Sequence, residues 1–201
     1  MISEKIENNQ NSTEQEALKI IYDTSKGLDH MHSLETPIAH RDIKIENILK
    51  KGKNYKLCDF GSSSDLTIDP KKCDKNYLGE QFSSFDKFTT FMYRPPEMCD
   101  QYCKYLINEK VDVWMLGCVL FTILFKKQPF QDAQKLAIIN AHYYIPEDGE
   151  GGAHYSEKIL DFMRLLLTPN PAFRPSIKQV LSLITNWNTM KSVPLNVRNF
   201  F

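Results

Sequence analysis

The chain has 201 residues, and its 25 basic and 25 acidic side chains give a formal net charge of zero. This balance argues against a general polyanion-binding surface and therefore against nucleic acid as a partner. A chain of this length can form one domain that buries about 70% of its unfolded surface. The five cysteines, together with an amino terminus that lacks a secretory signal, favour reduced thiols and a cytoplasmic location.

The first predicted element is a helix that follows a polar, flexible lead-in at residues 1–13. The helix begins near Thr13, because Thr13-Glu14-Gln15-Glu16 resembles a capping box. Gly27 weakens the helix without ending it. Its apolar residues recur at helical intervals, and they are Ala17, Leu18, Ile21, Leu28 and Met31.

Two short strands are expected next, Ile48-Leu49 and Tyr55-Lys56-Leu57, on either side of a polar turn at residues 50–54. Residues 62–90 are rich in Ser, Asp, Lys and Thr and show little periodicity. This composition predicts a long mobile loop of the kind usually kept for function.

The remaining elements are predicted to be helical, so the fold class is mainly α. The longest apolar run, Val113–Phe125, has 13 residues and is interrupted by Gly117 and Thr122, which makes it too short to span a bilayer. We therefore expect a buried helix there and no transmembrane segment. Prolines separate the four helices expected in this part, which are Val111–Phe125, Ala133–His142, Ser156–Leu167 and Ser176–Trp187.

Two motifs that carry phosphate chemistry follow each other in the first third of the chain. His40-Arg41-Asp42-Ile43-Lys44-Ile45-Glu46-Asn47 resembles the catalytic loop of a protein kinase, and Asp59-Phe60-Gly61 resembles its metal-binding segment. A His-Arg-Asp triplet alone would be interpreted as a surface turn. Lys44, Asn47 and the second motif follow at the right offsets, and they favour the kinase interpretation.

The residue types suit phosphoryl transfer, whose transition state is loose and highly charged. Asp42 is positioned to accept or orient the proton of the attacking hydroxyl, and Lys44 can neutralise the transferring group. Asn47 and Asp59 supply oxygen ligands for Mg²⁺, so ATP and Mg²⁺ are the expected cofactors. Lys44 also indicates serine or threonine as the acceptor. The resemblance further places Leu49 and Cys58 against the nucleotide.

Other matches concern the framework around these motifs. Tyr93-Arg94-Pro95-Pro96-Glu97 resembles the end of an activation segment, and Arg174 is the family's usual partner for Glu97. Asp112 resembles the aspartate that accepts backbone N–H groups of the catalytic loop; the alternative is a simple helix N-cap. Thr90 matches a threonine that bonds near the catalytic Asp and Lys.

Several remaining residues have competing interpretations. A phosphate on the activation loop could pair with Arg41, although for any single serine a solvating role is favoured. Cys58 could be an alkylation target, but a small buried apolar residue is the better interpretation of its native role. Cys99 and Cys103 lack a second Cys/His pair, which argues against zinc. His30 and His32 face apart on one helix, so neither is expected to be a metal ligand.

The resemblance extends to a subfamily. Glu46, Leu57-Cys58-Asp59-Phe60-Gly61-Ser62, Thr89-Thr90-Phe91-Met92-Tyr93-Arg94 and Gln128-Pro129-Phe130 are together similar to the Numb-associated kinases, which include the adaptor-associated and cyclin-G-associated kinases. That group has an extra helix after the activation segment, and 98–106 is compatible with one. The resemblance implies a protein substrate in a clathrin-adaptor subunit and peripheral membrane association.

A kinase also needs a glycine-rich loop, a strand lysine and a helical glutamate upstream of the catalytic loop. Gly149, Gly151 and Gly152 come too late to be that loop. We therefore expect a kinase-like carboxy-terminal lobe at residues 14–187, with a short β-hairpin at the catalytic cleft, no small lobe, and a tail at 188–201.

Two hypotheses follow from the missing small lobe. The chain is a serine/threonine kinase whose small lobe was lost by truncation or is supplied in trans, or it is a catalytically inactive scaffold that uses the kinase-like surface. Under the first hypothesis, the isolated chain should show negligible phosphoryl transfer. Leu49 and Phe60 should then be abnormally exposed and form an apolar patch.

Overall fold

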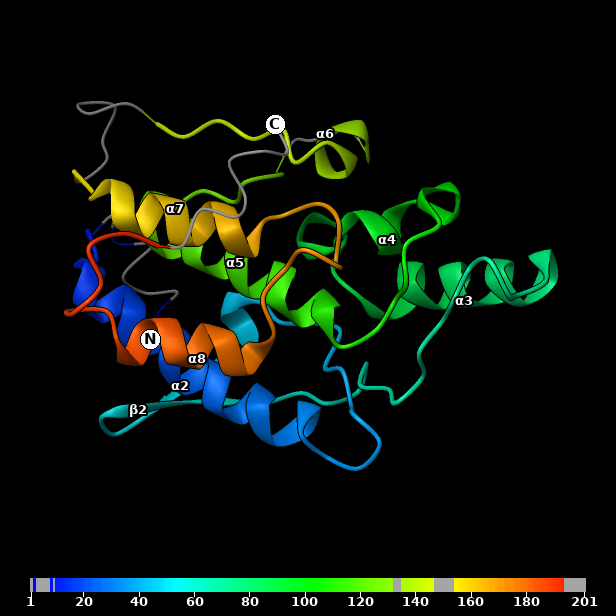
Figure 1. The fold of residues 1–201 in the computed structure, drawn as a ribbon, viewed down its shortest axis with the longest axis horizontal. Helices are drawn as coiled ribbons and strands as arrows, with labels where there is room; N and C mark the ends of the chain where they lie inside the picture. Colours follow the sequence, from blue (N-terminus) through cyan, green and yellow to red (C-terminus); the bar gives the residue numbers. More distant parts are fainter. Residues whose placement is uncertain (1, 3–7, 9, 132–134, 147–153, 194–201) are drawn as a thin grey trace.

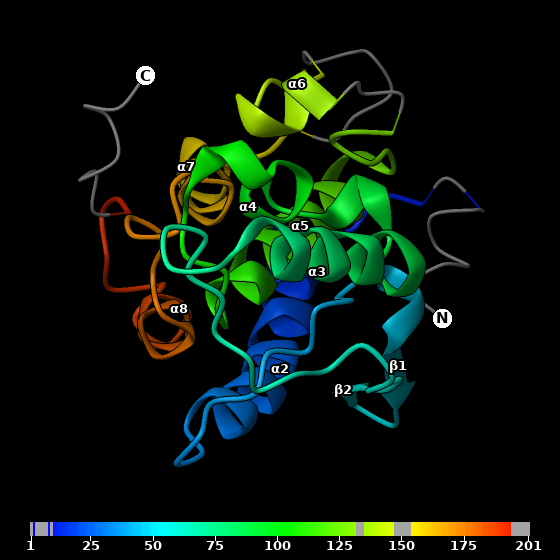
Figure 2. The same cartoon turned by 90° about the vertical axis from the view of Figure 1, so that its right-hand side faces the viewer.

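The computed structural model describes residues 2, 8, 10–131, 135–146 and 154–193. Four helices form its centre: α2 (Glu14–His32), α5 (Lys110–Phe125), α7 (Glu157–Leu166) and α8 (Ile177–Thr185). Helix α5 packs against α2 on one side and α7 on the other, and α8 also packs on α2. The hairpin and α7 lie at opposite ends of this stack (Figures 1 and 2). Within the described residues, the predicted mainly helical class is confirmed.

The predicted first helix is confirmed as α2, and its capping box is complete. The Thr13 hydroxyl accepts a bond from the Glu16 amide at 3.2 Å, and the Glu16 carboxylate accepts one from the Thr13 amide at 3.1 Å. Immediately before it, the Ser12 carbonyl lies 3.0 Å from the Tyr155 hydroxyl. This end of the predicted lead-in is therefore held against the core.

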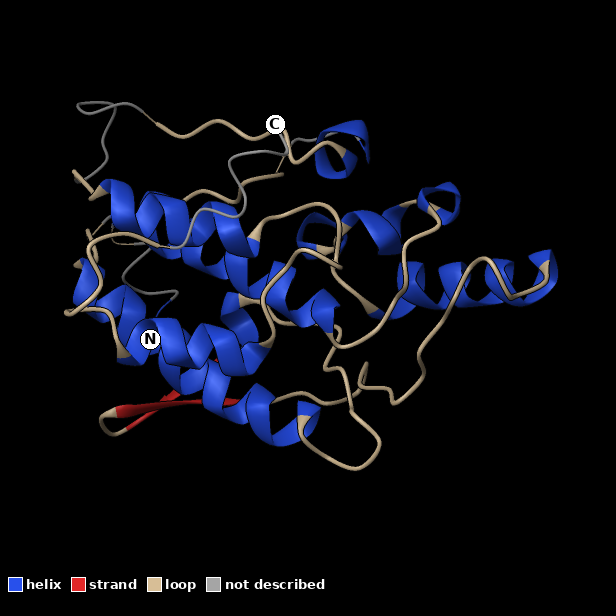
Figure 3. Ribbon diagram, in the orientation of Figure 1, coloured by secondary structure: helices blue, strands red, loops and turns tan. Residues whose placement is uncertain are grey.

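The predicted hairpin is confirmed as β1 (Ile48–Lys51) paired antiparallel with β2 (Asn54–Leu57), drawn as the two strands in Figure 3. Gly52 turns the chain with a φ of 63°, a conformation that favours glycine. The Asp23 carboxylate on α2 accepts a bond from the Tyr55 amide at 3.0 Å. This bond ties the hairpin to α2, and residues 40–47, which were predicted to form a catalytic loop, lie between these two elements in sequence.

Helix α5 is the buried centre of the fold. It begins at Lys110, and every residue from Val111 to Phe125 is buried. The apolar run is thus a core helix, as predicted. Among the described residues, no helix is both long and apolar enough to cross a membrane.

The expectation of a long mobile loop at residues 62–90 was wrong. Helix α3 occupies Lys75–Phe88, with the Asp74 carboxylate as its N-cap, accepting bonds from two backbone amides at 2.9 Å. Only Leu78 and Phe85 of this helix are buried, so its apolar periodicity is weak. Figure 1 shows α3 extending away from the central helices. Its stability depends on the cap and on docking rather than on a broad apolar face.

The single helix considered for residues 98–106 is also not present. Helix α4 covers Pro96–Cys99, and a 3₁₀ turn covers Gln101–Cys103. Asp100 has extended backbone angles between them, and Lys104 has a φ of 51° directly after them. These two residues break the helical path, so the segment forms two short turns.

The carboxy-terminal helices have the predicted positions with shorter ends. Helix α7 covers Glu157–Leu166 and α8 covers Ile177–Thr185, and Ser156 and Ser176 cap them. Helix α6 covers Lys135–Ile139. The predicted start of that element, at residues 133 and 134, lies outside the described residues.

Helices α5 and α7 approach each other closely at Gly117, so a larger side chain there should lower the stability of the fold. A Cβ atom there would lie 2.9 Å from Leu167 Cγ and 3.0 Å from Leu166 Cβ. Gly117→Ala is therefore expected to lower the free energy of unfolding by about 1–3 kcal/mol, because the packed helices must move apart. Urea denaturation measures this difference.

The matched control is Gly79→Ala on α3. A Cβ atom at Gly79 meets nothing within 4 Å, so alanine should raise helix stability by about 0.5–1 kcal/mol. Equal effects of the two substitutions would contradict the interpretation that α5 and α7 require glycine at their contact.

Candidate active site

The Asp112 carboxylate accepts hydrogen bonds from the backbone of the predicted catalytic loop, residues 40–47. Its Oδ2 accepts a bond from the His40 amide at 2.7 Å, and its Oδ1 accepts one from the Arg41 amide at 2.8 Å. Asp112 is fully buried inside the first turn of α5, whose N-cap is Glu109. The N-cap alternative for Asp112 is therefore wrong. The side chain fixes two consecutive amides of the loop instead.

His32 is a residue of this framework that the sequence did not reveal. Its Nε2 lies 2.8 Å from Asp112 Oδ2, and its side chain is 5% exposed. The spacing of His30 and His32 shows only that they face apart on α2. The partner lies 80 positions away in the sequence, so no local signal could identify this contact.

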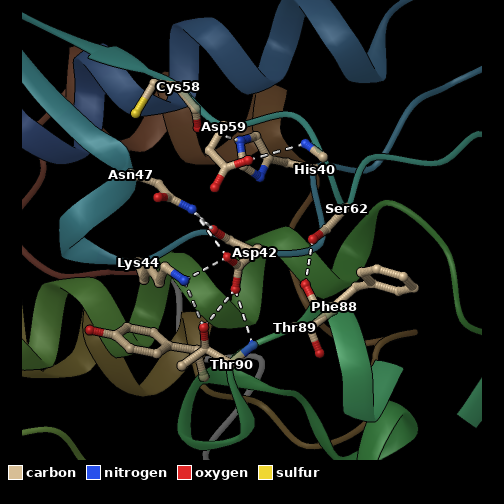
Figure 4. Close-up of polar contacts among 12 residues, drawn as sticks. His40, Asp42, Lys44, Asn47, Cys58, Asp59, Ser62, Phe88, Thr89 and Thr90 are labelled. Atoms are coloured by element: carbon tan, nitrogen blue, oxygen red, sulfur yellow. Dashed lines mark hydrogen bonds and ion pairs between the residues drawn. The ribbon is translucent and has the colours of Figure 1, made fainter. Parts of the chain in front are cut away.

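Asp42 is the centre of the polar cluster drawn in Figure 4. Its Oδ1 accepts bonds from the Thr90 amide at 3.1 Å and the Thr90 hydroxyl at 2.8 Å. Lys44 Nζ lies 2.8 Å from the other carboxylate oxygen and donates to the Thr90 hydroxyl at 2.9 Å. Thr90 therefore joins the end of the activation segment to both catalytic-loop side chains.

These contacts control the pKa of Asp42. Burial is the largest influence and would raise the pKa, but the hydrogen bonds from Lys44 and Thr90 and the charge of Lys44 together hold it below the ordinary value of 3.8. The carboxylate is thus ionised at neutral pH and able to accept a proton or orient a hydroxyl.

Lys44→Met is expected to raise the pKa of Asp42, because burial would then act with less opposition. Since the folded-state pKa is depressed, the associated stability is present above the unfolded-state pKa and is lost as the pH falls through the folded-state pKa. In Lys44→Met this loss should occur at higher pH. A ¹³C NMR titration of the carboxyl carbon measures the shift, and Lys50→Met on the exposed hairpin is the matched control. An unchanged midpoint in Lys44→Met would contradict the assignment.

Asn47 and Asp59 are brought together by the backbone. The Asn47 carbonyl accepts a bond from the Cys58 amide at 3.0 Å, which places Asp59 one residue from that contact. The Asn47 side-chain amide donates to the Asp42 carbonyl at 2.8 Å, so its Oδ1 is the atom left to act as a ligand. Asp59 is exposed and has a φ of 59°, and its Oδ1 also accepts a bond from the Gly61 amide at 3.3 Å.

This donor set fits Mg²⁺ that is shared with a nucleotide. Mg²⁺ is usually held by one or two protein oxygens together with phosphate oxygens and water, and one carboxylate with one amide oxygen meets that requirement. Elsewhere among the described residues, no group of three or more His, Cys, Asp or Glu side chains could hold a metal ion. All five cysteines are free of disulfide bonds.

Two of the three side chains predicted to face a nucleotide or small lobe are exposed. Leu49 is 46% exposed and Phe60 is 54% exposed, which confirms that part of the prediction. Cys58 is half-buried, and its carbonyl lies 3.2 Å from His40 Nε2. The Phe60 ring contacts the His40 ring, with centroids 5.2 Å apart. Phe60 also lines a cavity of about 480 Å³ between α2 and β2, which does not include Asp59.

The predicted Glu97–Arg174 pair is present and fully buried. The Arg174 guanidinium donates to both Glu97 oxygens, at 2.6 and 2.7 Å. Its remaining donors reach the carbonyls of Thr168, Pro169 and Lys110. Every donor direction is therefore used, and the pair joins α4 to the first residue of α5 and to the loop between α7 and α8.

Arg41 is less available to a phosphate than the sequence indicated. It is 5% exposed, donates to the Leu66 carbonyl at 2.6 Å, and lies with its guanidinium carbon 5.6 Å from the centroid of the Phe85 ring of α3. Burial lowers its pKa, against the opposing charge of Asp112. Phosphate pairing with Arg41 stays a prediction, and it would require Phe85 to move.

Comparisons with known proteins agree with this geometry. Residues 1–184 match the protein kinase domain family. A probable serine/threonine-protein kinase of Dictyostelium discoideum is 42% identical over 173 residues, 85% of this chain and 21% of the relative. A second from that organism is 37% identical over 179 residues, 87% of this chain and 15% of the relative.

An actin-regulating kinase of Saccharomyces cerevisiae is 37% identical over 190 residues, 94% of this chain and 22% of the relative. The chain thus spans between 15% and 22% of the length of these curated relatives. A family match over residues 1–184, together with the predicted pairing of Glu97 and Arg174, leads to one conclusion: the chain belongs to the protein kinase family.

Proposed function

We propose that this chain supplies the catalytic large lobe of a serine/threonine protein kinase, which transfers the γ-phosphoryl group of ATP to a protein hydroxyl. The observation that carries the proposal is the Asp42 carboxylate, bonded on one oxygen by Thr90 and on the other by Lys44. A carboxylate held in one orientation beside a lysine can position an acceptor hydroxyl and accept its proton.

The lysine and threonine have distinct roles in this proposal. Lys44 is partly exposed, so its charge can stabilise the negative charge of the transferring phosphoryl group without leaving Asp42. The Thr90 hydroxyl donates to Asp42 and accepts from Lys44, which sets the distance between the base and the cation. The activation segment therefore helps to complete the site through Thr90.

ATP and Mg²⁺ would be held by the neighbouring face. Asn47 Oδ1 and the Asp59 carboxylate are the proposed ligands of Mg²⁺, with Leu49 and Cys58 beside the nucleotide. Bound Mg²⁺ would neutralise phosphate charge during transfer. The exposure of Asp59 and the engagement of the Asn47 amide nitrogen support this arrangement.

A small lobe is proposed to cover this face during catalysis. Within the described residues, the only strands are those of the β1–β2 hairpin, and Leu49 and Phe60 are exposed apolar side chains at its edge. Covering them would remove water from the phosphates and strengthen the electrostatic contacts there. The covering lobe can be part of a longer protein or be supplied in trans.

The test is a phosphoryl-transfer assay with Mg²⁺, labelled ATP and a serine/threonine peptide mixture. The chain is assayed alone and with a separately purified kinase small lobe that carries a glycine-rich loop, a strand lysine and a helical glutamate. We expect negligible transfer by the chain alone and Asp42-dependent transfer with the added lobe. Transfer that survives in Asp42→Asn would contradict the assigned chemistry. Strong, Asp42-dependent transfer by the chain alone would contradict the need for a small lobe.

A second candidate is a catalytically inactive scaffold, favoured by the exposed apolar side chains of Leu49 and Phe60. The intact Asp42–Lys44–Thr90 cluster favours the kinase, because a scaffold has no need of it. Binding of a partner without transfer, with the small lobe present, would support the scaffold.

The finer proposal concerns substrate and place of action. The sequence similarity to Numb-associated kinases supports a clathrin-adaptor subunit as substrate, with the protein acting in the cytoplasm and associating peripherally with membranes. Phosphorylation of adaptor peptides in preference to an unrelated serine/threonine mixture tests the substrate class.

A further inference from the structure

The carboxy-terminal end of α3 receives hydrogen bonds from outside the helix. The last carbonyls of any helix lack intrahelical partners and need other donors. The Phe88 carbonyl accepts a bond from the Ser62 hydroxyl at 2.5 Å. One residue later, the Thr89 carbonyl accepts a bond from the Arg94 guanidinium at 2.9 Å. Both donors come from segments that flank α3, so the helix end is held between them.

The Ser62 bond connects the two functional halves of the site. Ser62 directly follows Asp59-Phe60-Gly61, whereas Phe88 lies two residues before Thr90, as Figure 4 shows. The bond thus joins the segment proposed to hold Mg²⁺ to the segment that contacts the catalytic carboxylate. It spans 26 positions of the sequence.

The backbone around Ser62 is itself anchored, so its side chain can act as a fixed tether. Ser64 and Ala39 exchange two backbone hydrogen bonds of 2.9 Å, which attach this segment to the residue before His40. The Ser63 amide donates to the Phe60 carbonyl at 3.0 Å. A side chain on a fixed backbone can hold the end of α3 at a defined distance from residues 40–47.

We propose that Ser62 is a positioning residue: its hydroxyl holds the end of α3 so that Thr90 meets Asp42 while Asp59 faces the same site. The catalytic part of this inference rests on the proposed kinase function, whereas the structural part is independent of it. Ser62 touches no reacting atom in this proposal and acts through Thr90.

The two serines after Ser62 do not make the hydrogen bond that Ser62 makes to the Phe88 carbonyl. The Ser63 hydroxyl is buried and has no hydrogen-bond partner, and the Ser64 hydroxyl accepts only a local bond, from the Leu66 amide at 3.1 Å. Ser62 alone among these three adjacent serines reaches across to α3. Ser63→Ala is consequently a matched control that removes the same atoms without removing a cross-segment bond.

The expected effect is moderate because the helix has other attachments. Phe85 packs on Arg41, and Arg94 also bonds the Thr89 hydroxyl at 2.7 Å. Removing the Ser62 hydroxyl should therefore loosen the last turn of α3 and leave its body in place. A lost hydrogen bond of this kind corresponds to about a three- to tenfold change in the opening equilibrium.

The experiment compares Ser62→Ala, Ser62→Thr and Ser63→Ala by hydrogen exchange of the complete chain. The Thr89 amide donates to the Phe85 carbonyl and the Thr90 amide to Asp42, so both amides report on the helix end. Ser62→Ala should speed their exchange by about three- to tenfold, while Ser62→Thr, which keeps the hydroxyl, and Ser63→Ala should match the original chain. An unchanged rate in Ser62→Ala, or equal acceleration in Ser63→Ala, would overturn the proposal.

The kinetic arm uses the chain with the added small lobe. Ser62→Ala should lower kcat by about three- to tenfold and change KM for the peptide less, because Thr90 orients the Asp42 carboxylate that acts in the transfer step. Rescue by Ser62→Thr is expected, and failure of that rescue would count against a role for the hydroxyl. If the original chain with the added small lobe transfers no phosphoryl group, the proposed function fails, and the exchange arm still decides whether Ser62 holds α3.

Discussion

Asp42→Asn is expected to lower phosphoryl transfer by about 10²- to 10⁴-fold, the range usual for loss of a positioned general base. Asparagine keeps the size of the side chain and can still accept a bond from the Thr90 hydroxyl. It loses the negative charge that pairs with Lys44 at 2.8 Å and the ability to accept the proton of the attacking hydroxyl. Initial rates with labelled ATP, Mg²⁺ and the added small lobe measure the loss.

The matched control for this substitution is Asp29→Asn on α2. The Asp29 carboxylate accepts a bond from the Ser33 hydroxyl at 3.2 Å and has no contact with the Thr90 cluster. Its replacement should leave the rate close to that of the original chain. Similar losses in both variants would indicate a general effect on folding, which circular dichroism and urea denaturation would reveal. A fully active, folded Asp42→Asn chain would contradict the assigned role.

Glu97→Ala is expected to lower the free energy of unfolding by about 3–5 kcal/mol, because it leaves the buried Arg174 charge without its partner. Both side chains of this pair are fully buried, and the two N–O contacts are 2.6 and 2.7 Å. The backbone carbonyls that Arg174 also contacts carry partial charges only, so they cannot replace the carboxylate. Urea denaturation of the two chains at equal protein concentration measures the difference.

The matched control for the buried pair is the exposed pair of Glu157 and Arg164. Glu157 is 76% exposed and lies 3.0 Å from the guanidinium of Arg164, so Glu157→Ala should cost about 1 kcal/mol or less. A double-mutant cycle with Arg174→Met then isolates the coupling between Glu97 and Arg174. Strict additivity of the two single substitutions would contradict the assignment of a coupled buried pair.

Elements with strong local signals could be predicted from the sequence. A complete capping box begins α2, strand-forming residues flank a polar turn in the hairpin, and α5 is a continuous apolar run. Each of these signals comes from residues close together in the chain. The bounds of these elements consequently differ from the expected ones by a few residues at most.

Helix α3 could not be predicted in the same way. It contains Gly79 and two serines, and only Leu78 and Phe85 are buried. A helix with such a narrow apolar contact has little periodicity, so its composition resembles a loop. The helix is stabilised by contacts that its own sequence does not reveal. Phe85 packs over Arg41, and hydrogen bonds hold the two ends of α3.

The motifs likewise predicted which residues belong to the candidate site, but they did not predict every side chain that those residues contact. The types and spacing of four residues predict phosphoryl transfer, because that reaction uses a base, a cation and oxygen ligands for Mg²⁺; they are Asp42, Lys44, Asn47 and Asp59. The sequence did not show that His32 contacts Asp112, or that Arg41 is covered by α3. Those partners lie on elements that are distant in sequence.

The sequence by itself determined the protein kinase family, the mainly helical class and the local elements, because these depend on short motifs and periodic patterns. Only the tertiary structure decided which side chains meet: Thr90 with Asp42, Ser62 with the end of α3, and His32 with Asp112. The physical reason is that a hydrogen bond between distant segments depends on how whole helices pack. No pattern within either segment specifies that packing.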